Sequence, residues 1–307
     1  MNSPHLTTAW KIAALLALSL CLAACNGSES TPTPSGNTPG APTQPGDTPA
    51  ATPTDLLPSA TPLPLAARVN GEGLSLAEFE SELARYQASG TNLATDAQQA
   101  VLDELIAQVL LAQAAAENGF VVDEALLQTR LEALAAQLGG VQALSDWMAA
   151  NGYSQADFEA ALARSIAAAW MRDQIIAAVP ETADQAHVRQ ILLYNLDQAN
   201  QVYQALQSGS DFASLAAQYD PQTGGDLGWF PQGYLTEPAI EAAAFALEPG
   251  AYSTVIETRL GYHLIQLIER ESNRLLLPPM RQALQTQALS QWLEERRSQS
   301  EIQIMLP

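Results

Sequence analysis

Apolar residues follow helical spacing from about Leu65 to Pro180. In the middle of this stretch, apolar residues recur every third or fourth position, which places them on one face of a helix. Residues typical of helix N-caps, and Asn-Gly or Gly-Gly steps typical of helix ends, divide the stretch into five helices. The central stripe consists of Val101, Leu102, Leu105, Ile106, Val109 and Leu110, and the expected caps are Ser75, Asp96, Asp123 and Ser154. We therefore expect an all-α domain at residues 65–183, introduced by a short strand and an Asn70-Gly71 turn.

The pattern changes after this point, because short apolar runs begin to alternate with short helices. His187 to Leu193 has the pattern of a strand. Val255 to Thr258 and Tyr262 to Ile268 are two more, joined by a tight turn at Gly261. Helices are expected at 196–207, 211–218 and 238–247. Together these elements predict a compact α+β unit at residues 184–271.

The last segment, 272–307, is expected to form a helix followed by a short strand. Met280, Leu284, Leu289 and Trp292 are apolar positions on the helix, and Ile302 to Met305 alternates as a strand does. An isolated helix of this length is marginal in water, so it must pack against something larger. We expect it to pack on the helical domain, which would make residues 184–271 an insertion.

Composition limits the partners that the chain can have. The formal net charge is −20, with 33 acidic and 13 basic residues, so nucleic acid and anionic lipid surfaces are repelled. Lys11 is the only lysine, and Cys21 and Cys25 are the only cysteines. A disulfide framework, a cysteine-rich metal site and a redox pair are therefore excluded. We expect no metal and no cofactor.

The N-terminus has the organisation of an export signal. An apolar core from Ile12 to Leu20 follows Lys11 and is too short to span a bilayer as a stable helix. It leads into Leu22-Ala23-Ala24-Cys25, which resembles the bacterial lipobox. That resemblance implies a signal peptide at residues 1–24, a lipid on Cys25, and attachment to the extracytoplasmic face of a bacterial membrane. An ordinary secretory signal cleaved after Ala23 or Ala24 is the alternative.

Residues 25–64 have the composition of a linker. More than half of the chain's 19 prolines lie here, among Thr, Ser, Gly and Ala, without apolar periodicity. Such a segment cannot bury a core, so it is predicted to be a disordered spacer between the membrane and the folded part. A proline-rich ligand for another domain is a second interpretation.

Two motifs in the α+β unit point to a site. Gly224 to Phe230 holds three glycines, an acid and two aromatic residues, and Gly261-Tyr262-His263 follows downstream. They indicate a shaped, apolar, non-metal site that binds peptide. A hydrolase or a metal enzyme is disfavoured, because residues 25–307 hold only His187 and His263 and no Gly-x-Ser-x-Gly turn.

The unit resembles the parvulin-type peptidyl-prolyl isomerases in residue order along its whole length. The matching residues, besides the two motifs, are Ala199, Val202, Leu206, Gly209, Asp211-Phe212, Leu215-Ala216, Tyr219, Ala243 to Leu247 and Pro249-Gly250. The larger organisation is similar to PrsA-like and SurA-like extracytoplasmic foldases. The resemblance implies an α+β fold class, with an all-α chaperone-like domain formed by the N- and C-terminal segments and an inserted, FKBP-like parvulin domain.

The resemblance also implies a pocket for the proline ring. In the family a leucine or methionine and two aromatic residues line it. The matching positions are Leu235, Phe245 and, one residue out of register, Ile240, where the family usually has phenylalanine. Trp229 in the glycine motif is a further candidate for the pocket.

The polar side of the site departs from the family. His263 matches the second of the usual two histidines and Thr258 the usual threonine, but Gln190 stands where the first histidine is expected. His187 lies three residues earlier and by strand alternation faces the other way. The loop that carries the family's aspartate is short here, and Asp220 is the best candidate for that role.

Two functions follow from these residues, and a third is weighed against them. The first is a membrane-anchored isomerase and chaperone that acts on unfolded, newly exported polypeptides with Xaa-Pro bonds. The second is a holdase whose parvulin unit only binds peptide, since glutamine can hydrogen-bond but cannot titrate. A lipid-anchored solute-binding protein is the third, but it would need two α/β lobes that the pattern does not supply. The apolar residues of the helical domain fit a bundle core or a groove for unfolded chains equally well.

Overall fold

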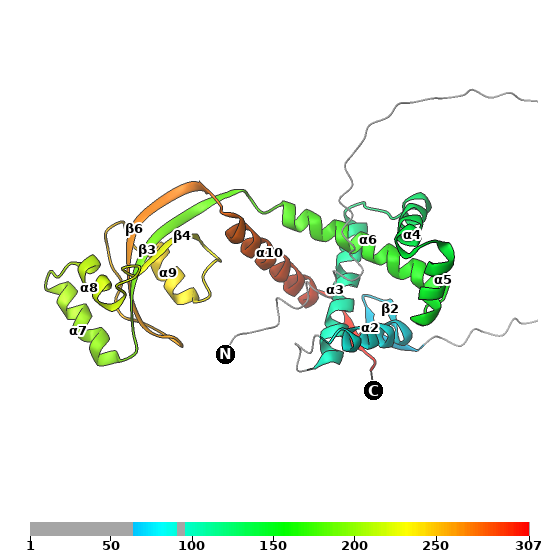
Figure 1. Ribbon diagram of the computed structural model, residues 1–307, viewed down its shortest axis with the longest axis horizontal. Coiled ribbons are helices and arrows are strands. Elements are labelled where there is room, and N and C mark those ends of the chain that lie inside the picture. Colours follow the sequence, from blue (N-terminus) through cyan, green and yellow to red (C-terminus); the bar gives the residue numbers. More distant parts are fainter. Residues whose placement is uncertain (1–63, 91–95, 307) are drawn as a thin grey trace, which may run out of the picture. The chain divides into compact units, whose positions relative to one another are not determined.

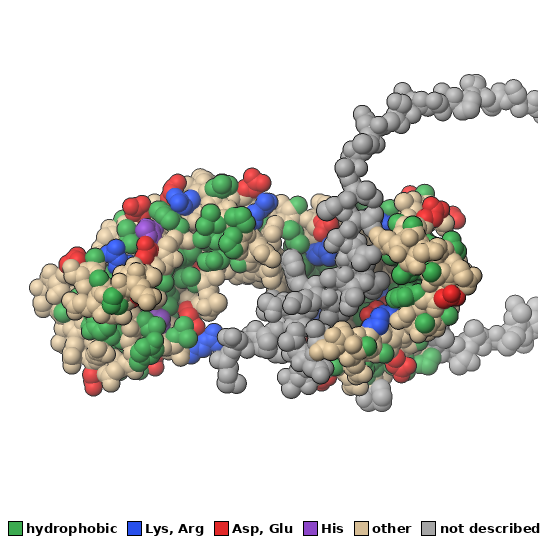
Figure 2. Space-filling view, in the orientation of Figure 1, with side chains coloured by type: hydrophobic (Ala, Val, Ile, Leu, Met, Phe, Trp, Pro, Cys, Tyr) green, Lys and Arg blue, Asp and Glu red, His purple; other side chains and the backbone are tan. Residues whose placement is uncertain are grey.

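The computed structural model describes residues 64–90 and 96–306 (Figure 1). The predicted signal peptide, the lipid attachment at Cys25 and nearly all of the predicted linker lie outside the described residues. Within the described ranges, no helix combines the length and apolar character needed to cross a membrane. Acidic side chains are spread over the visible face and basic ones are sparse, in keeping with the net charge (Figure 2).

The chain divides by its internal contacts into two compact units. The first contains Gly73–Glu104 with the described residues up to Ala67 and from Ile304 onward. The second contains Arg68–Glu72 and Leu105–Gln303. The elements outside the predicted α+β unit are β1 (Leu65–Val69), β2 (Glu72–Ser75), α2 (Leu76–Ala88), α3 (Ala97–Glu117), α4 (Glu124–Leu138), α5 (Val141–Ala150), α6 (Gln155–Ala177), α10 (Pro278–Ser298) and β7 (Ile302–Ile304).

The helices begin at the capping residues that the sequence indicates. Ser75 accepts a hydrogen bond from the Glu78 N–H at 3.1 Å, and Asp123 accepts one from the Leu126 N–H at 2.8 Å. Each cap supplies an acceptor for a backbone donor that has no partner within the helix. Gly139 ends α4 with a φ of 102°, a conformation that glycine adopts without strain.

A small sheet accompanies these helices, with strand order β2-β1-β7. Asn70 and Gly71 both have positive φ and form the tight turn between β1 and β2. In the first unit the Met305 N–H donates to Ala66 O at 2.9 Å, and in the second the Asn70 N–H donates to Glu301 O at 2.8 Å. The predicted helical domain is therefore not purely α-helical. Its first residues form β1 and β2, and these strands share a sheet with β7.

The C-terminal helix packs on the helices that precede the insertion. Leu289 of α10 is buried with Leu111 of α3 and Ala168 of α6, and Trp292 packs against this cluster. The side chain of Gln285 donates to Ile176 O at 3.4 Å, and Arg296 pairs with Glu117. Both ends of the chain thus contribute to the helical part, and the α+β unit is inserted between α6 and α10.

The α+β unit is built on a four-stranded antiparallel sheet with the order β4-β3-β6-β5. Its elements are β3 (Thr182–Leu193), α7 (Leu196–Gln207), α8 (Phe212–Tyr219), β4 (Asp226–Pro231), α9 (Pro238–Ala246), β5 (Ile256–Thr258) and β6 (Gly261–Leu275). β3 and β6 are longer than predicted, and the glycine motif forms most of β4, which the sequence pattern did not indicate. Gly228 interrupts the alternation along that strand, because it carries no side chain.

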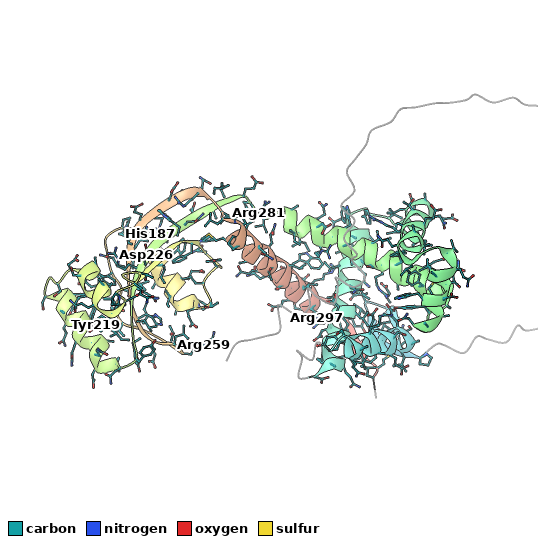
Figure 3. The ribbon with its side chains drawn as sticks, in the orientation of Figure 1. His187, Tyr219, Asp226, Arg259, Arg281 and Arg297 are labelled. Atoms are coloured by element: carbon teal, nitrogen blue, oxygen red, sulfur yellow. The ribbon has the colours of Figure 1, made fainter. Side chains whose placement is uncertain are left out.

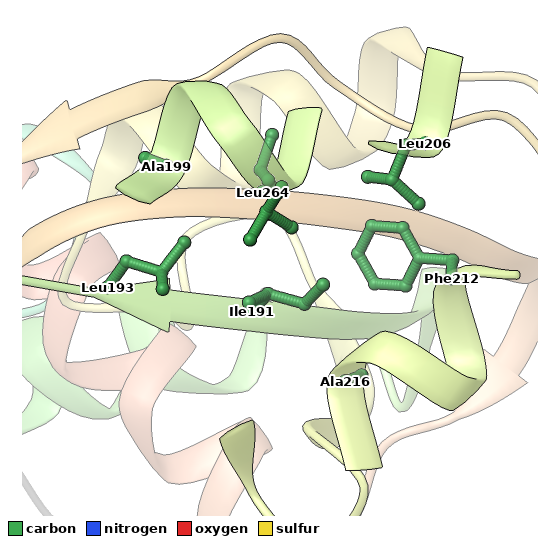
Figure 4. Packing of buried hydrophobic residues seen from close by; sticks show 8 residues of the cluster. Ile191, Leu193, Ala199, Leu206, Phe212, Ala216 and Leu264 are labelled. Atoms are coloured by element: carbon green, nitrogen blue, oxygen red, sulfur yellow. The ribbon is translucent and has the colours of Figure 1, made fainter. Parts of the chain in front are cut away.

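The helices cover opposite faces of this sheet. Ile191 and Leu193 of β3 and Leu264 of β6 point toward Ala199 of α7 and Phe212 of α8 (Figure 4). The neighbouring strand residues point the other way, since side chains alternate along a strand. On that second face the buried cluster consists of Ala186, Val188, Phe230, Ile240, Ala244, Ile265 and Leu267, and α9 covers it.

Candidate functional site

Three polar side chains form a continuous hydrogen-bonded row on the sheet face that α9 covers. His263 of β6 is 2% exposed. Its Nδ1 lies 3.1 Å from Gln190 Oε1 on β3, and its Nε2 lies 2.9 Å from Thr258 Oγ1 at the end of β5. The three residues come from three adjacent strands, which fixes their spacing. The structure therefore brings together Gln190, His263 and Thr258 as the sequence leads one to expect.

The partners of His263 define its protonation. The carboxamide oxygen of Gln190 is an acceptor, so Nδ1 carries the proton and Nε2 accepts from the Thr258 hydroxyl. That hydroxyl oxygen in turn accepts the Leu260 N–H at 3.0 Å. Burial lowers the pKa of His263 below its ordinary value, and the negative charge of Glu237 acts in the opposite direction. The ring is therefore neutral near pH 7.

Asp220 occupies a different position from the one expected. Its carboxylate accepts the Gln222 N–H at 3.1 Å and the Thr223 N–H at 3.2 Å, and it bonds the Thr223 hydroxyl. The Thr223 hydroxyl bond is the largest cause of the lowered pKa of Asp220. Among the contacts of the described residues, none joins Asp220 to His263. It organises the turn before the glycine motif instead.

That turn contacts the backbone of Gln190, one member of the polar row. The Gly225 N–H donates to Thr223 Oγ1 at 3.2 Å, and Gly225 O accepts the Gln190 N–H at 2.8 Å. Gly225 has a φ of 74°, and a Cβ at this position would collide with the carbonyl oxygen of Gln190. Glycine is therefore required for the turn to approach β3 at the residue that bonds His263.

The expected pocket residues differ in how far they reach the surface. Leu235 and Phe245 are partly buried and pack against the cluster under α9. Ile240 belongs to the same cluster but is only 4% exposed. It therefore lies in the core against which Leu235 and Phe245 pack. Phe245 meets Phe230 edge to face at 6.2 Å between ring centroids.

Trp229 lies apart from these residues. Its ring stacks on His187 at 5.3 Å, and the Arg274 guanidinium lies 4.2 Å from its centroid. The neighbouring Phe230 contacts Phe245, so alternation along β4 directs Trp229 to the opposite face. The expectation that Trp229 joins the pocket is therefore corrected. His187 bonds Asp226 at 2.8 Å, and both are labelled in Figure 3. By strand alternation His187 faces away from the row, as its position on β3 predicts.

Two charged residues that the sequence reading passed over hold the ends of α9. Glu241, in the first turn, accepts backbone N–H groups from Gly233, Tyr234 and Leu235. Arg270 of β6 donates through Nη2 to Phe245 O and Leu247 O, each at 2.8 Å. Its guanidinium also lies 5.8 Å from the centroid of Phe245. Neither role has a signal in the sequence, because the partners are backbone groups and Arg270 lies on β6, far along the chain from α9.

Two family models match the chain over adjacent stretches. Residues 54–172 match the SurA-like N-terminal domain, and residues 175–269 match the PPIC-type PPIASE domain. The chain thus has one stretch similar to each of these two domain families. The stretch that matches the PPIC-type domain contains Gln190, Thr258 and His263, together with the whole glycine motif.

The curated relatives similar to this chain include a chaperone and a foldase. Chaperone SurA of Burkholderia thailandensis is 38% identical over 144 residues, which are 40% of this chain and 32% of the relative. Foldase protein PrsA of Caldanaerobacter subterraneus subsp. tengcongensis is 41% identical over 91 residues, 28% of this chain and 29% of the relative. The chain thus matches about a third of the length of these relatives.

Solved structures include a peptidylprolyl isomerase (PrsA) from Bacillus cereus. It aligns with 75% of this chain and 87% of its own length, at 23% identity and a TM-score of 0.44. Within the described residues, no group of three or more His, Cys, Asp or Glu side chains is placed to hold a metal ion.

Proposed function

We propose that the chain is a peptidyl-prolyl cis-trans isomerase that acts on unfolded or newly exported polypeptides. One observation carries the proposal: the row Gln190–His263–Thr258 lies on the same sheet face as Leu235 and Phe245. Apolar side chains that accept a proline ring thus stand on the same face as neutral hydrogen-bonding groups. The match to the PPIC-type family supports the same conclusion.

The reaction requires no covalent bond to the substrate. The barrier to rotation is about 18–20 kcal/mol and arises from amide resonance. An apolar pocket that excludes water favours the twisted amide, which has lost that resonance and its charge separation. In the proposed mechanism Leu235 and Phe245 hold the proline ring, and Ile240 supports them from the core. His263, kept neutral by burial, orients the polar side of the site with Thr258 and Gln190.

Gln190 sets the character of the polar row. A carboxamide at this position accepts the His263 Nδ1–H and carries no charge at any pH. We propose that the row is a fixed scaffold that shapes the pocket and that it transfers no proton. Asp220 acts at a distance in this scheme, through Thr223 and Gly225, by holding the turn that contacts Gln190.

The test is cis-to-trans exchange of a short Xaa-Pro peptide in the presence of the chain. The wild type is expected to accelerate exchange, and Phe245→Ala is expected to reduce the acceleration about tenfold or more through loss of apolar contact. His263→Ala is expected to have a similar effect, since it removes the centre of the row. Trp229→Ala is the matched aromatic control and leaves the rate within about twofold.

The alternative function is a holdase whose PPIC-type domain only binds peptide. The observation that favours this function is Gln190, which stands where the parvulin family usually has a titratable histidine. This function predicts that the wild type suppresses aggregation of an unfolded client while peptide exchange stays at the buffer rate. A wild type that accelerates exchange, with loss in Phe245→Ala, would rule out the binding-only function.

We also propose that the chain is held at the extracytoplasmic face of a bacterial membrane by a lipid on Cys25, with residues 25–64 as spacer. Support comes from the apolar core at Ile12 to Leu20 and the small residues before Cys25. The domain boundaries proposed are 65–183 for the SurA-like part, 184–271 for the isomerase and 272–307 for the returning segment.

The anchor is tested by expression in a bacterium supplied with labelled palmitate. Wild-type chain is expected to take up label and to sediment with membranes, whereas Cys25→Ser loses both properties. Cys21→Ser is the control and keeps them. Equal labelling of wild type and Cys25→Ser would show that the anchor is absent.

A further inference from the structure

Glu241 has an unusual set of partners for a helix residue. Its Oε1 accepts the Gly233 N–H at 2.7 Å, and its Oε2 accepts the Tyr234 and Leu235 N–H groups, each at 3.1 Å. Three consecutive backbone donors therefore converge on one carboxylate. Bonds to a charged acceptor are stronger than those between neutral groups, and a carboxylate has enough lone pairs for all three.

The loop that supplies these donors also packs on the core, because Tyr234 and Leu235 contact the buried cluster under α9. It runs from the end of β4 to the start of α9 and has no regular secondary structure. Gly233 adopts a φ of 85°, and a Cβ there would meet the end of the Gln287 side chain of α10. Leu235 is the last of the three donors, so its main chain is fixed directly by Glu241 Oε2.

Glu241 is itself well placed to keep its charge in position. It lies in the first turn of α9, where the partial positive charge of the helix N-terminus favours an anion. Its helix neighbour Ile240 is buried in the core, which anchors the turn from which Glu241 reaches the loop. The carboxylate thus joins the first turn of α9 to the loop that precedes it.

We propose that Glu241 is a positioning residue for isomerisation, which acts by fixing the Gly233–Leu235 loop and thereby the Leu235 wall of the proline pocket. The inference rests on the proposed isomerase function. Glu241 contacts no substrate in this role, and its effect on the rate passes through Leu235.

The choice of substitution follows from the donors. In Glu241→Gln one carboxylate oxygen becomes an NH₂ group, which faces backbone N–H donors and leaves at least one of them without an acceptor. Glu241→Asp keeps the charge and both acceptors on a side chain shorter by one methylene. Glu248→Gln removes an exposed carboxylate just beyond α9 and serves as the matched control.

The experiment is a double-mutant cycle on the full chain, with peptide exchange as the readout. Wild type, Glu241→Gln, Leu235→Ala and the double variant are compared at a temperature below all four unfolding midpoints. Glu241→Gln is expected to slow catalysed exchange about tenfold, because small displacements of a positioning group have large effects on rate. In the Leu235→Ala background the same change is expected to alter the rate less than about twofold. Glu248→Gln exchanges at the wild-type rate, and Glu241→Asp recovers part of the loss.

The outcomes separate the inference from the function on which it rests. A wild type that exchanges peptide no faster than buffer contradicts both. An active wild type with an unaffected Glu241→Gln overturns the positioning role alone, as does an equal loss with and without Leu235. If Glu241→Gln does not fold, Glu241→Asp goes through the same cycle, and its loss must likewise disappear in Leu235→Ala.

Discussion

Single side chains decide what the polar row can do. Gln190 fills a position where a second histidine would introduce another titratable ring, and it fixes the tautomer of His263 through one hydrogen bond. His263 therefore has one neutral form with both nitrogens used. The row carries no charge above pH 7, and His263 is its titratable member.

Stability should fall as His263 is forced to titrate. Its pKa in the folded chain lies below the value of about 6.5 expected when unfolded, because burial disfavours the charged ring. Below about pH 6.5 the unfolded state binds a proton that the folded state refuses, so the free energy of unfolding decreases as the pH falls. Above that pH the contribution is complete.

Denaturant unfolding at pH 7.5, 6.5 and 5.5 measures this effect. Wild type is expected to lose stability over this range relative to His263→Gln, which cannot titrate. All other titratable groups are the same in both chains, so their effects cancel. The carboxylates with lowered pKa, Asp211, Asp220 and Asp226, titrate below the range. Parallel pH profiles for the two chains would contradict the assignment.

At the scale of elements, the glycine motif acts as a strand with a preceding turn. The turn at Gly224-Gly225 presses against β3, and β4 then pairs with β3 from Arg189 to Gln185 with a register shift after Val188. This shift lets the motif contact the backbone of Gln190 while the strand continues. The two glycines are adjacent and both have positive φ, but only Gly225 lies against the backbone of β3.

Replacing each glycine by alanine separates those demands. Gly225→Ala is expected to destabilise the chain by about 2 kcal/mol or more, since its Cβ meets the Gln190 carbonyl and its φ is positive. Gly224→Ala also has positive φ but open space around it, so the expected loss is about 1 kcal/mol. Denaturant midpoints measure both, and equal losses would mean that the close approach to β3 contributes nothing.

The sequence predicts the elements that have strong local signals. The capped helices, the Asn70-Gly71 turn and the partnership of His263 with Thr258 and Gln190 follow from periodicity and from the resemblance. It does not reveal β4 as a strand, because glycine shows no alternation. Without the register of β4, the sequence cannot separate Phe230 from Trp229, which point to opposite faces. The sequence also does not reveal the role of Glu241, because its partners are backbone N–H groups, which no side-chain pattern shows.

At the scale of the whole molecule, the helical part and the inserted unit have different features. The helical part has exposed apolar residues such as Val121 and Val141, at 72% and 77% exposure, and the inserted unit has the polar row around the buried His263. The insertion is joined to the helices by β3 and β6, whose first and last residues pair, Thr182 with Leu275. Gln185 is buried there and donates to the carbonyls of Arg274 and Leu275.

The adjacent entry and exit of the insertion have an evolutionary consequence. The Leu276 N–H donates to Glu181 O at 2.9 Å, so the residues just outside the two strands already touch. Removing everything between them would leave a gap that a short turn can close, with α6 and α10 still in register. We therefore expect that recombination can delete, duplicate or replace the inserted unit while α6 and α10 stay joined.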